Sequence, residues 1–218
     1  MNYLKVTTAF LLVLVIYSYN SNAKMTIEKM KVAILIYDGV YLLDFAGPLE
    51  VFNDAMINDS TQAFDVFLVS PTNKSIKCHT NTDIAANYTI GNCPEPDVLV
   101  IPGGNLRLAS ENAKIGEWIK NANLKTKVTM SVCTGAFILA DLGLLDSMKA
   151  CTWYGATSRL QKMFPKINVQ SGIRYIDNGK IITTAGVSAG VDGALHGVEK
   201  LFGKEIADRT ATYIEWIR

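Results

Sequence analysis

The hydrophobic positions of the chain gather in short, nearly unbroken runs that are separated by longer amphipathic stretches. Runs of this length, rich in β-branched residues, are typical of strands that are buried on both faces of a sheet. The sequence predicts such strands at residues 31–37, 64–70, 98–101 and 127–132, with shorter or extended pieces at 75–90 and 149–152. Two further strands, at 171–176 and 180–184, flank the turn Asp177-Asn178-Gly179.

Helices are predicted between these strands. They are expected at residues 44–56, 110–121, 136–142, after 152 to about 164, 186–202 and 204–217. Strands that alternate with helices indicate an α/β fold, with a mostly parallel central sheet covered on both faces. No repeat or linker interrupts the pattern, so residues 24–218 are expected to form a single domain.

Four segments follow predicted strands and are expected to converge. In sheets of this class, sites lie beyond the carboxyl ends of the strands. The segments are residues 37–44, 102–104, 132–135 and 185–190. The search for chemistry therefore concentrates on these four turns.

The first residues differ in character from the rest of the chain. Lys5 precedes an apolar run at residues 9–16, and small and polar residues follow it. This order of parts predicts a cleaved export signal at residues 1–23, and hence a periplasmic or secreted protein. The run is shorter than the roughly 18 apolar residues that span a bilayer, so no stable membrane anchor is expected after cleavage. The alternative is a cytoplasmic protein translated from Met25 or Met30.

Composition narrows the class of partner. The 218 residues include 21 Lys and Arg against 20 Asp and Glu, which gives a formal net charge of +1. Without a basic field, nucleic acid is not an expected partner. A hydrophobic share of 49 % and a charged share of 19 % fit a globular domain rather than a disordered chain or a coiled coil.

The four cysteines do not form a metal-binding pattern. No C-x-x-C pair occurs among Cys78, Cys93, Cys133 and Cys151, and no histidine lies at ligand spacing, so no metal site is expected. In an exported protein Cys78 and Cys93 could form a disulfide. Two separate buried thiols are the favoured interpretation.

Cys133 is the strongest candidate for chemistry. The apolar strand 128–132 leads into it, and Thr134-Gly135 opens the next helix without a loop. So tight a turn is expected to hold Cys133 in a strained conformation at its apex, as a nucleophile elbow. The helix N-terminus is expected to lower the pKa of the thiol. The alternative, a structural cysteine at a strand end, is disfavoured by the glycine and the missing loop.

Two further turns could complete a site around Cys133. Pro102-Gly103-Gly104 ends a strand, and glycine there would let a substrate approach the backbone, so Gly103 is a candidate substrate contact. The amides of Gly104 and Thr134 are candidate donors to an anion formed at Cys133. Asp44 follows the first strand, which is expected to lie beside the strand of the elbow. From spacing alone, a proton-transfer role for Asp44 and a helix N-cap are equally supported.

The remaining candidates are weaker. The only histidines, His79 and His196, are not expected to adjoin the elbow, which argues against a Cys–His couple. Trp153 and Tyr154 could wall an apolar substrate pocket, although core packing explains them equally well. Ser188 lies in one of the converging turns and is a candidate substrate contact.

Four segments make the chain resemble a known family. They are Asp-Phe-Ala-Gly-Pro-Leu-Glu-Val-Phe at 44–52, Val-Leu-Val-Ile-Pro-Gly-Gly at 98–104, Ser-Val-Cys-Thr-Gly-Ala at 131–136 and Thr-Ala-Gly-Val-Ser-Ala-Gly-Val-Asp at 184–192. In this order they resemble the PfpI-type family of the class I glutamine amidotransferase-like superfamily, over residues 31–217. Within it, the likeness is strongest to isonitrile hydratases and to the ligand-side domains of AraC-type regulators.

The resemblance implies a flavodoxin-like three-layer sandwich, a homodimer, and catalysis by Asp44, Cys133 and Thr134. Thr134 stands where peptidases of the family carry a histidine, so a peptidase is not implied. Trp153 stands where hydratase- and regulator-like relatives often carry the histidine of Thr-His-Trp, which leaves the shape of the pocket open. The chain stops at Arg218 without a helix-turn-helix segment, so DNA binding is not expected.

These features favour an isonitrile hydratase-like lyase that hydrates a small molecule through a Cys133 thiolate. A thiolate nucleophile and an electrophilic substrate carbon need no metal or organic cofactor. The alternatives are a ligand- or redox-sensing domain with a reactive cysteine, and a glyoxalase- or deglycase-type enzyme.

Overall fold

The computed structural model describes residues 28–72, 75–105 and 112–218. The predicted export signal and the start of the helix expected at Ser110 lie outside these residues. In the described part, no helix is long and apolar enough to cross a membrane.

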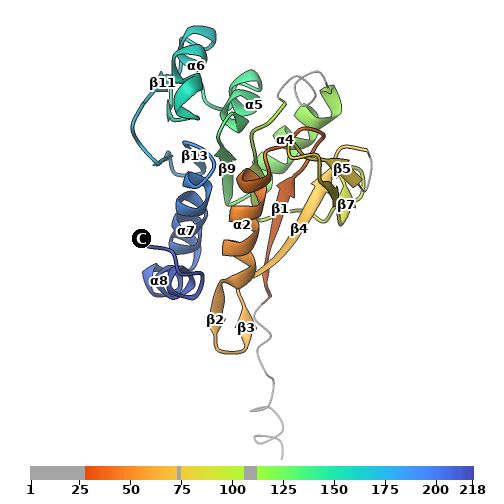
Figure 1. The fold of residues 1–218 in the computed structure, drawn as a ribbon, viewed down its shortest axis with the longest axis vertical. Coiled ribbons are helices and arrows are strands. Elements are labelled where there is room, and N and C mark those ends of the chain that lie inside the picture. The colour runs from red at the N-terminus through yellow and green to blue at the C-terminus, as the bar shows by residue number, and fades with distance from the viewer. Residues whose placement is uncertain (1–27, 73–74, 106–111) are drawn as a thin grey trace, which may run out of the picture.

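A seven-stranded sheet forms the centre of the fold (Figure 1). Its strands, in order across the sheet, are β12 (Tyr175–Asp177), β13 (Ile181–Thr184), β9 (Val128–Val132), β8 (Val98–Ile101), β1 (Met30–Leu35), β4 (Phe64–Ser70) and β7 (Tyr88–Thr89). All neighbouring pairs are parallel except β12 and β13, which form the predicted hairpin. The four strands at the centre are almost wholly buried, which explains their apolar sequences.

Helices cover both faces of the sheet, so the predicted three-layer sandwich is confirmed (Figure 1). The helices are α2 (Leu42–Asp54), α4 (Ala113–Lys125), α5 (Gly135–Asp141), η1 (Tyr154–Ala156), α6 (Thr157–Met163), α7 (Ala189–Phe202) and α8 (Lys204–Tyr213). Helices α2, α7 and α8 pack on one another, and α5 packs on β8 and β9. The core is continuous through these layers.

Three small ladders lie outside the main sheet. They are β2 (Met56–Asn58) with β3 (Thr61–Gln62), β5 (Ser75–Lys77) with β6 (Asp83–Ala85), and β10 (Lys149–Ala150) with β11 (Asn168–Val169). The β2–β3 hairpin and β11 were not expected from the sequence, and the strand expected at 149–152 pairs with β11 rather than with the main sheet. Pairings of two or three residues leave little hydrophobic pattern to recognise.

The expected neighbourhood of the first strand is wrong in one respect. Strand β8 lies between β1 and β9, so the first strand does not adjoin the strand of the elbow. Loops at the carboxyl ends of all three strands nevertheless meet at one edge.

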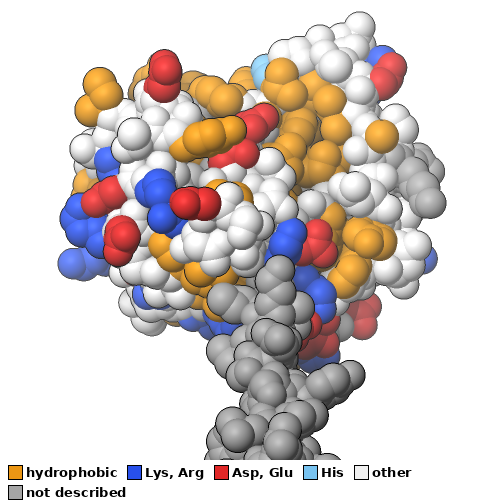
Figure 2. Space-filling model, turned by 90° about the horizontal axis from the view of Figure 1, so that it is seen from below, with side chains coloured by type: hydrophobic (Ala, Val, Ile, Leu, Met, Phe, Trp, Pro, Cys, Tyr) orange, Lys and Arg blue, Asp and Glu red, His pale blue; other side chains and the backbone are white. Residues whose placement is uncertain are grey.

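The molecule seen from below carries acidic and basic side chains interspersed, with no field of a single sign on that face (Figure 2).

Candidate active site

Cys133 occupies the sharp turn between β9 and α5. Its φ angle of 58° lies in the left-handed region, which costs about 1–2 kcal/mol for a residue with a side chain. The backbone N–H of Cys133 donates to the Thr184 carbonyl at 3.2 Å, and the Thr152 hydroxyl donates to the Cys133 carbonyl at 2.8 Å. These bonds hold the residue in its strained conformation. The strain predicted for the apex of the elbow is therefore present.

The sulfur of Cys133 is enclosed by two neighbouring turns. A Cβ atom at Gly186 would lie 3.1 Å from the sulfur, so this loop packs directly against the thiol. Both the backbone N–H and the hydroxyl of Thr134 hydrogen-bond to the sulfur. Cys133 is only 5 % exposed. A group that reaches this sulfur must therefore be slender.

Asp44 lies on the first turn of α2 and is fully buried. One carboxylate oxygen accepts the N–H of Gly103 at 3.0 Å, and the other accepts the N–H of Val187 at 3.0 Å. The residue that precedes the helix as its N-cap is Tyr41, so Asp44 does not cap α2. Its carboxylate faces other elements of the fold and hydrogen-bonds the thiol of Cys133.

The absence of a side chain at Gly103 explains how Asp44 reaches the elbow across β8. A Cβ atom there would lie 2.9 Å from the Asp44 carboxylate and 2.6 Å from the Thr134 hydroxyl. Gly103 thus fills the space between these two residues with backbone alone. A side chain in that space would force them apart.

The environment of Cys133 raises the pKa of its thiol to about 12. Burial is the largest cause, the charge of Asp44 adds to it, and the Thr134 N–H offsets only part. The expectation of an acidic thiol, based on the helix N-terminus, is therefore wrong, because desolvation outweighs the local dipole. Burial also raises the pKa of Asp44, although the Val187 and Gly103 amides and the Cys133 thiol act against it.

Thiol and carboxylate therefore form a coupled pair. At neutral pH the thiol keeps its proton and donates it in a hydrogen bond to Asp44. The Tyr37 hydroxyl lies in the same buried region and donates to the Pro102 carbonyl at 2.9 Å. Burial, followed by the charges of Asp44 and Cys133, raises the pKa of Tyr37, so this phenol stays neutral.

The other candidates from the sequence have different outcomes. The N–H of Gly104 donates to the Thr134 hydroxyl at 3.2 Å, so it is not a free donor to an anion. The Ser188 hydroxyl accepts a bond from Arg174 at 3.2 Å and is likewise committed. Trp153 is 39 % exposed, and its ring packs over Gly155. It directly follows Thr152, whose hydroxyl donates to the Cys133 carbonyl.

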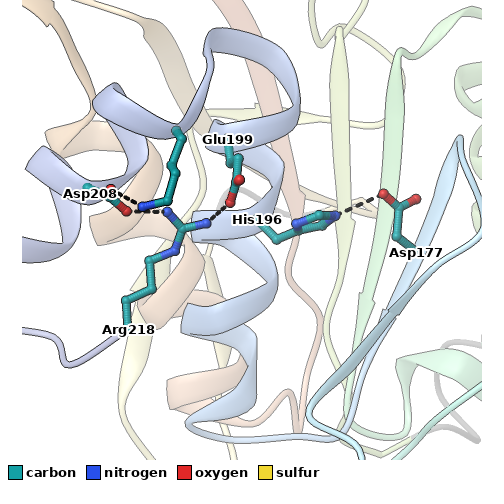
Figure 3. A network of polar contacts seen from close by, with 6 residues as sticks. Asp177, His196, Glu199, Asp208 and Arg218 are labelled. Carbon is teal, nitrogen blue, oxygen red and sulfur yellow. Dashed lines mark hydrogen bonds and ion pairs between the residues drawn. The ribbon is translucent and has the colours of Figure 1, made fainter.

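The two histidines also differ from expectation. His79 stacks on Tyr41 with ring centroids 4.0 Å apart, and its Nδ1 accepts the N–H of Leu42 at 3.2 Å. It therefore adjoins the turn of α2 that carries Asp44, which corrects the expectation that it is remote. His196 is remote, and its Nε2 pairs with Asp177 at 2.8 Å (Figure 3).

The sequence did not single out Val187, Gly186, Thr152 or Tyr37. Val187 and Gly186 belong to the segment that was expected to converge, but nothing in their residue types marked them. All four cysteines are free thiols, so Cys78 and Cys93 are separate as expected, but only Cys78 is buried and Cys93 is half-buried. In the described ranges, no group of three or more His, Cys, Asp or Glu side chains is placed to hold a metal ion.

Comparisons with known proteins show the family of the chain. A model of the DJ-1/PfpI family matches residues 30–200, from β1 into α7. The chain belongs to the DJ-1/PfpI family. The isonitrile hydratase of Pseudomonas putida is similar to this chain. It is 27 % identical over 188 residues, which cover 86 % of this chain and 78 % of that protein.

A transcriptional regulator and solved structures are also similar to this chain. The HTH-type transcriptional regulator GbdR of Pseudomonas aeruginosa is 21 % identical over 176 residues, covering 81 % of this chain and 48 % of the regulator. The structure of a THiJ/PfpI family protein from Pseudomonas syringae is 25 % identical, with a TM-score of 0.78, and covers 91 % of this chain and 80 % of that one. Drosophila melanogaster DJ-1beta has the same TM-score at 17 % identity, with coverage of 88 % and 100 %, which shows the shared fold alone.

Proposed function

We propose that the protein is a lyase that adds water to an isonitrile-type small molecule and gives an N-substituted formamide. Cys133 is the nucleophile and Asp44 transfers the protons. The observation that carries this proposal is the buried pair of the Cys133 thiol and the Asp44 carboxylate on a strained elbow. The isonitrile hydratase among the relatives supports the choice of substrate class.

The surroundings of the sulfur favour a slender reactive end on an apolar substrate. A terminal isonitrile carbon is a narrow, electrophilic end that suits a nearly enclosed thiol. Four apolar or aromatic side chains near the pair are each 39–44 % exposed: Tyr41, Leu43, Trp153 and Val187. Tyr41 and Leu43 lie within three residues of Asp44, Val187 bonds Asp44, and Trp153 follows Thr152, which bonds Cys133. These side chains form an apolar rim that suits an alkyl or aryl substituent.

The first step couples proton transfer to addition. Because the pKa of the resting thiol is raised to about 12, Asp44 removes its proton as the sulfur attacks. An S–C bond forms at the terminal carbon of R–N≡C, and Asp44 returns the proton to that same carbon. The product of this step is the thioimidate R–N=CH–S–Cys133. The Thr134 N–H stabilises charge on the sulfur while it forms the bond.

The second step releases the product. Asp44 removes a proton from a water molecule that attacks the thioimidate carbon, and this proton passes to the nitrogen. The C–S bond then breaks, and the second water proton returns to the sulfur as the oxygen forms the carbonyl of R–NH–CHO. The sum is one isonitrile and one water consumed for one formamide, with the pair restored. In this proposal the Thr134 hydroxyl orients the water.

The test is formamide production by the purified protein from simple alkyl and aryl isonitriles, with methylglyoxal as the competing glyoxalase substrate. Turnover is expected with wild type and its loss with Cys133→Ala. Cys151→Ala is the matched control, because Cys151 is also buried with a raised pKa but donates to Thr183 instead of Asp44. No formamide from wild type, or equal rates with and without Cys133, would reject the proposal.

A second candidate is a sensing module, which the likeness to transcriptional regulators supports. Such a module binds the small molecule at the same pair without releasing a product. Binding of an isonitrile as a stable adduct at Cys133, with no formamide, would identify it. For an oxidant sensor, intact mass after mild peroxide should show modification of Cys133 before Cys78. This is a demanding test, because hydrogen bonds from Thr80 and Thr82 outweigh burial and lower the pKa of Cys78.

Two expectations from the sequence stay proposals. We propose a homodimer, which sedimentation at micromolar concentration tests, and a monomer would exclude it. We also propose export with cleavage after Ala23, so that Lys24 begins the mature chain. N-terminal sequencing from the native host decides this, and a start at Met1, Met25 or Met30 would exclude cleavage.

A further inference from the structure

His79 contacts the first turn of α2, which carries Asp44, from a distant part of the sequence. It lies in the turn between β5 and β6, and backbone bonds fix this hairpin on the loop before α2. The N–H of Gly39 donates to the Lys77 carbonyl at 2.8 Å, and the N–H of His79 donates to the Val40 carbonyl at 2.9 Å. The position of the imidazole is therefore set by the fold rather than by a free side chain.

The imidazole of His79 completes the start of α2. The side chain of the N-cap residue Tyr41 makes no capping bond, and the Leu42 N–H donates instead to His79 Nδ1 at 3.2 Å. An Nδ1 that accepts a hydrogen bond carries no proton, so the ring is neutral with its proton on Nε2. Stacking on Tyr41 at 4.0 Å and 16° fixes the plane of the ring. Asp44 lies two residues after Leu42 on the same turn.

We propose that His79 is a positioning residue for Asp44: its neutral ring holds the first turn of α2, and its protonation releases that turn and places a positive charge near the Asp44 carboxylate. The proposal rests on the proposed function, in which Asp44 accepts the thiol proton. Protonated Nδ1 is a donor and cannot accept from Leu42. A nearby cation also favours the ionised form of a carboxyl and so makes it a weaker base.

The charged groups nearest His79 on its own hairpin are paired with other groups. Lys77 and Asp83 of the same hairpin pair with each other at 3.0 Å, and Asp38 is exposed and accepts the backbone N–H of Lys77. The positive charge of a protonated imidazole acts on the pKa of Asp44 by lowering it. The coupling therefore acts wherever the His79 imidazole gains its proton, and the titration described next measures that pH.

The chain offers a direct measurement, because it contains only two histidines. In ¹⁵N-histidine protein, NMR follows both imidazoles through a pH titration. Replacement of Asp44 by Asn should lower the titration midpoint of His79 by on the order of half a pH unit. The midpoint of His196 should stay, and should move only in Asp177→Asn, since His196 pairs with Asp177. An unmoved His79 midpoint in Asp44→Asn would overturn the proposal.

Two variants and the wild type separate the effect of the acceptor from that of the ring. His79→Asn keeps an acceptor at the place of Nδ1 but cannot titrate. His79→Phe keeps the stacking but offers no acceptor, whereas wild-type His79 has the acceptor and the stacked ring together. The protection factor of the Leu42 amide, which is its intrinsic exchange rate at each pH divided by the observed rate, should be about tenfold higher above the His79 midpoint than below it in wild type. The amide should stay protected at every pH in His79→Asn and unprotected in His79→Phe. Protection that ignores pH in wild type would contradict the role as acceptor.

The consequence for the reactive pair is measured at Cys133 itself. The logarithm of the iodoacetamide alkylation rate of Cys133 should bend at the His79 midpoint in wild type and rise without that bend in His79→Asn. The same bend in both proteins would overturn the link to Asp44. None of these three measurements needs turnover of an isonitrile. Failure of the proposed substrate and failure of the role of His79 are thus distinguishable.

Discussion

Two aspartates of this molecule are used in opposite ways. Asp44 is fully buried, and its two oxygens accept backbone N–H groups from Gly103 and Val187. No cation hydrogen-bonds to it in the part of the chain that the structure describes. Burial therefore raises its pKa despite the two amides. The result is a carboxylate that can take up and return a proton.

Asp177, the last residue of β12, has basic side chains as partners instead. Its carboxylate bonds His196 at 2.8 Å (Figure 3). It also accepts a bond from Lys200 at 3.0 Å and the Gly179 N–H at 2.7 Å. Burial alone would raise the pKa of Asp177, but the His196 and Lys200 bonds outweigh it and lower the pKa. This carboxylate stays ionised and ties the edge hairpin to a helix. A bonded lysine thus separates this structural carboxylate from Asp44, the carboxylate that we propose to move protons.

The largest expected effect is on turnover. Asp44→Asn should lower kcat about 10²–10⁴-fold, because the amide cannot accept the thiol proton. Asp177→Asn should leave kcat/KM within about twofold, since Asp177 lies outside the reactive pair. Formamide production by both variants is the measurement. Comparable losses in the two variants would abolish the distinction between the two aspartates.

The second effect concerns the thiol. Wild-type Cys133 should be alkylated by iodoacetamide more slowly at pH 7 than free cysteine, whose pKa is about 8.5. Asp44→Ala removes a like charge, so it should lower the pKa of Cys133 and speed alkylation about tenfold or more. Mass spectrometry across a pH series reads both rates, with Asp177→Ala as the control. Slower alkylation in Asp44→Ala would show that Asp44 instead donates a hydrogen bond to a thiolate.

The direction of that effect marks the boundary of what the sequence could predict. The strands were predictable, because a doubly buried strand such as 98–101 must be apolar throughout. The elbow was predictable, because Cys133-Thr134-Gly135 allows no loop. The sign of the Cys133 pKa was not predictable, since it depends on burial and on Asp44, which three-dimensional packing determines. The helix N-terminus is the local contribution, and it is the smaller one here.

Contacts between distant segments were equally hidden. His79 is 37 residues from Leu42 and Val187 is 143 residues from Asp44, and neither contact leaves a periodic signal. The β2–β3 hairpin was missed because the expected helix was extended to Met56, where β2 begins. Conversely, Asp44 was correctly singled out, but only as one of two equal interpretations. The structure excludes Asp44 as the N-cap of α2, because Tyr41 occupies that position.

The third prediction concerns stability and pH. Because the pKa of Asp177 is lower in the folded state, its stabilisation is present above the unfolded value of about 3.9 and is lost as pH falls through the folded pKa. Asp177→Asn should therefore cost about 1–2 kcal/mol at pH 7 and little below about pH 3. Asp44 has the opposite sign, since its raised pKa makes protonation favour the folded state. Urea unfolding at both pH values tests this, and a loss independent of pH would exclude the ionic contribution of Asp177.

The smallest effect compares the residues that donate to the two carboxylates. Val187 donates to Asp44 with a φ of 50°, whereas Gly179 donates to Asp177 with a φ of 89°. A β-branched residue is strained in this region, and glycine is not. Val187→Gly should therefore raise stability by about 0.5–1 kcal/mol, or roughly 2–4 °C in Tm, since its half-exposed side chain contributes little burial. Gly179→Ala should lower stability by about 1 kcal/mol through the backbone alone, because a Cβ atom there meets nothing within 4 Å. Calorimetry of the two variants gives both signs. A loss of stability in Val187→Gly would show that the packing of the Val187 side chain outweighs its backbone strain. The side chain would then help to hold the N–H that donates to Asp44.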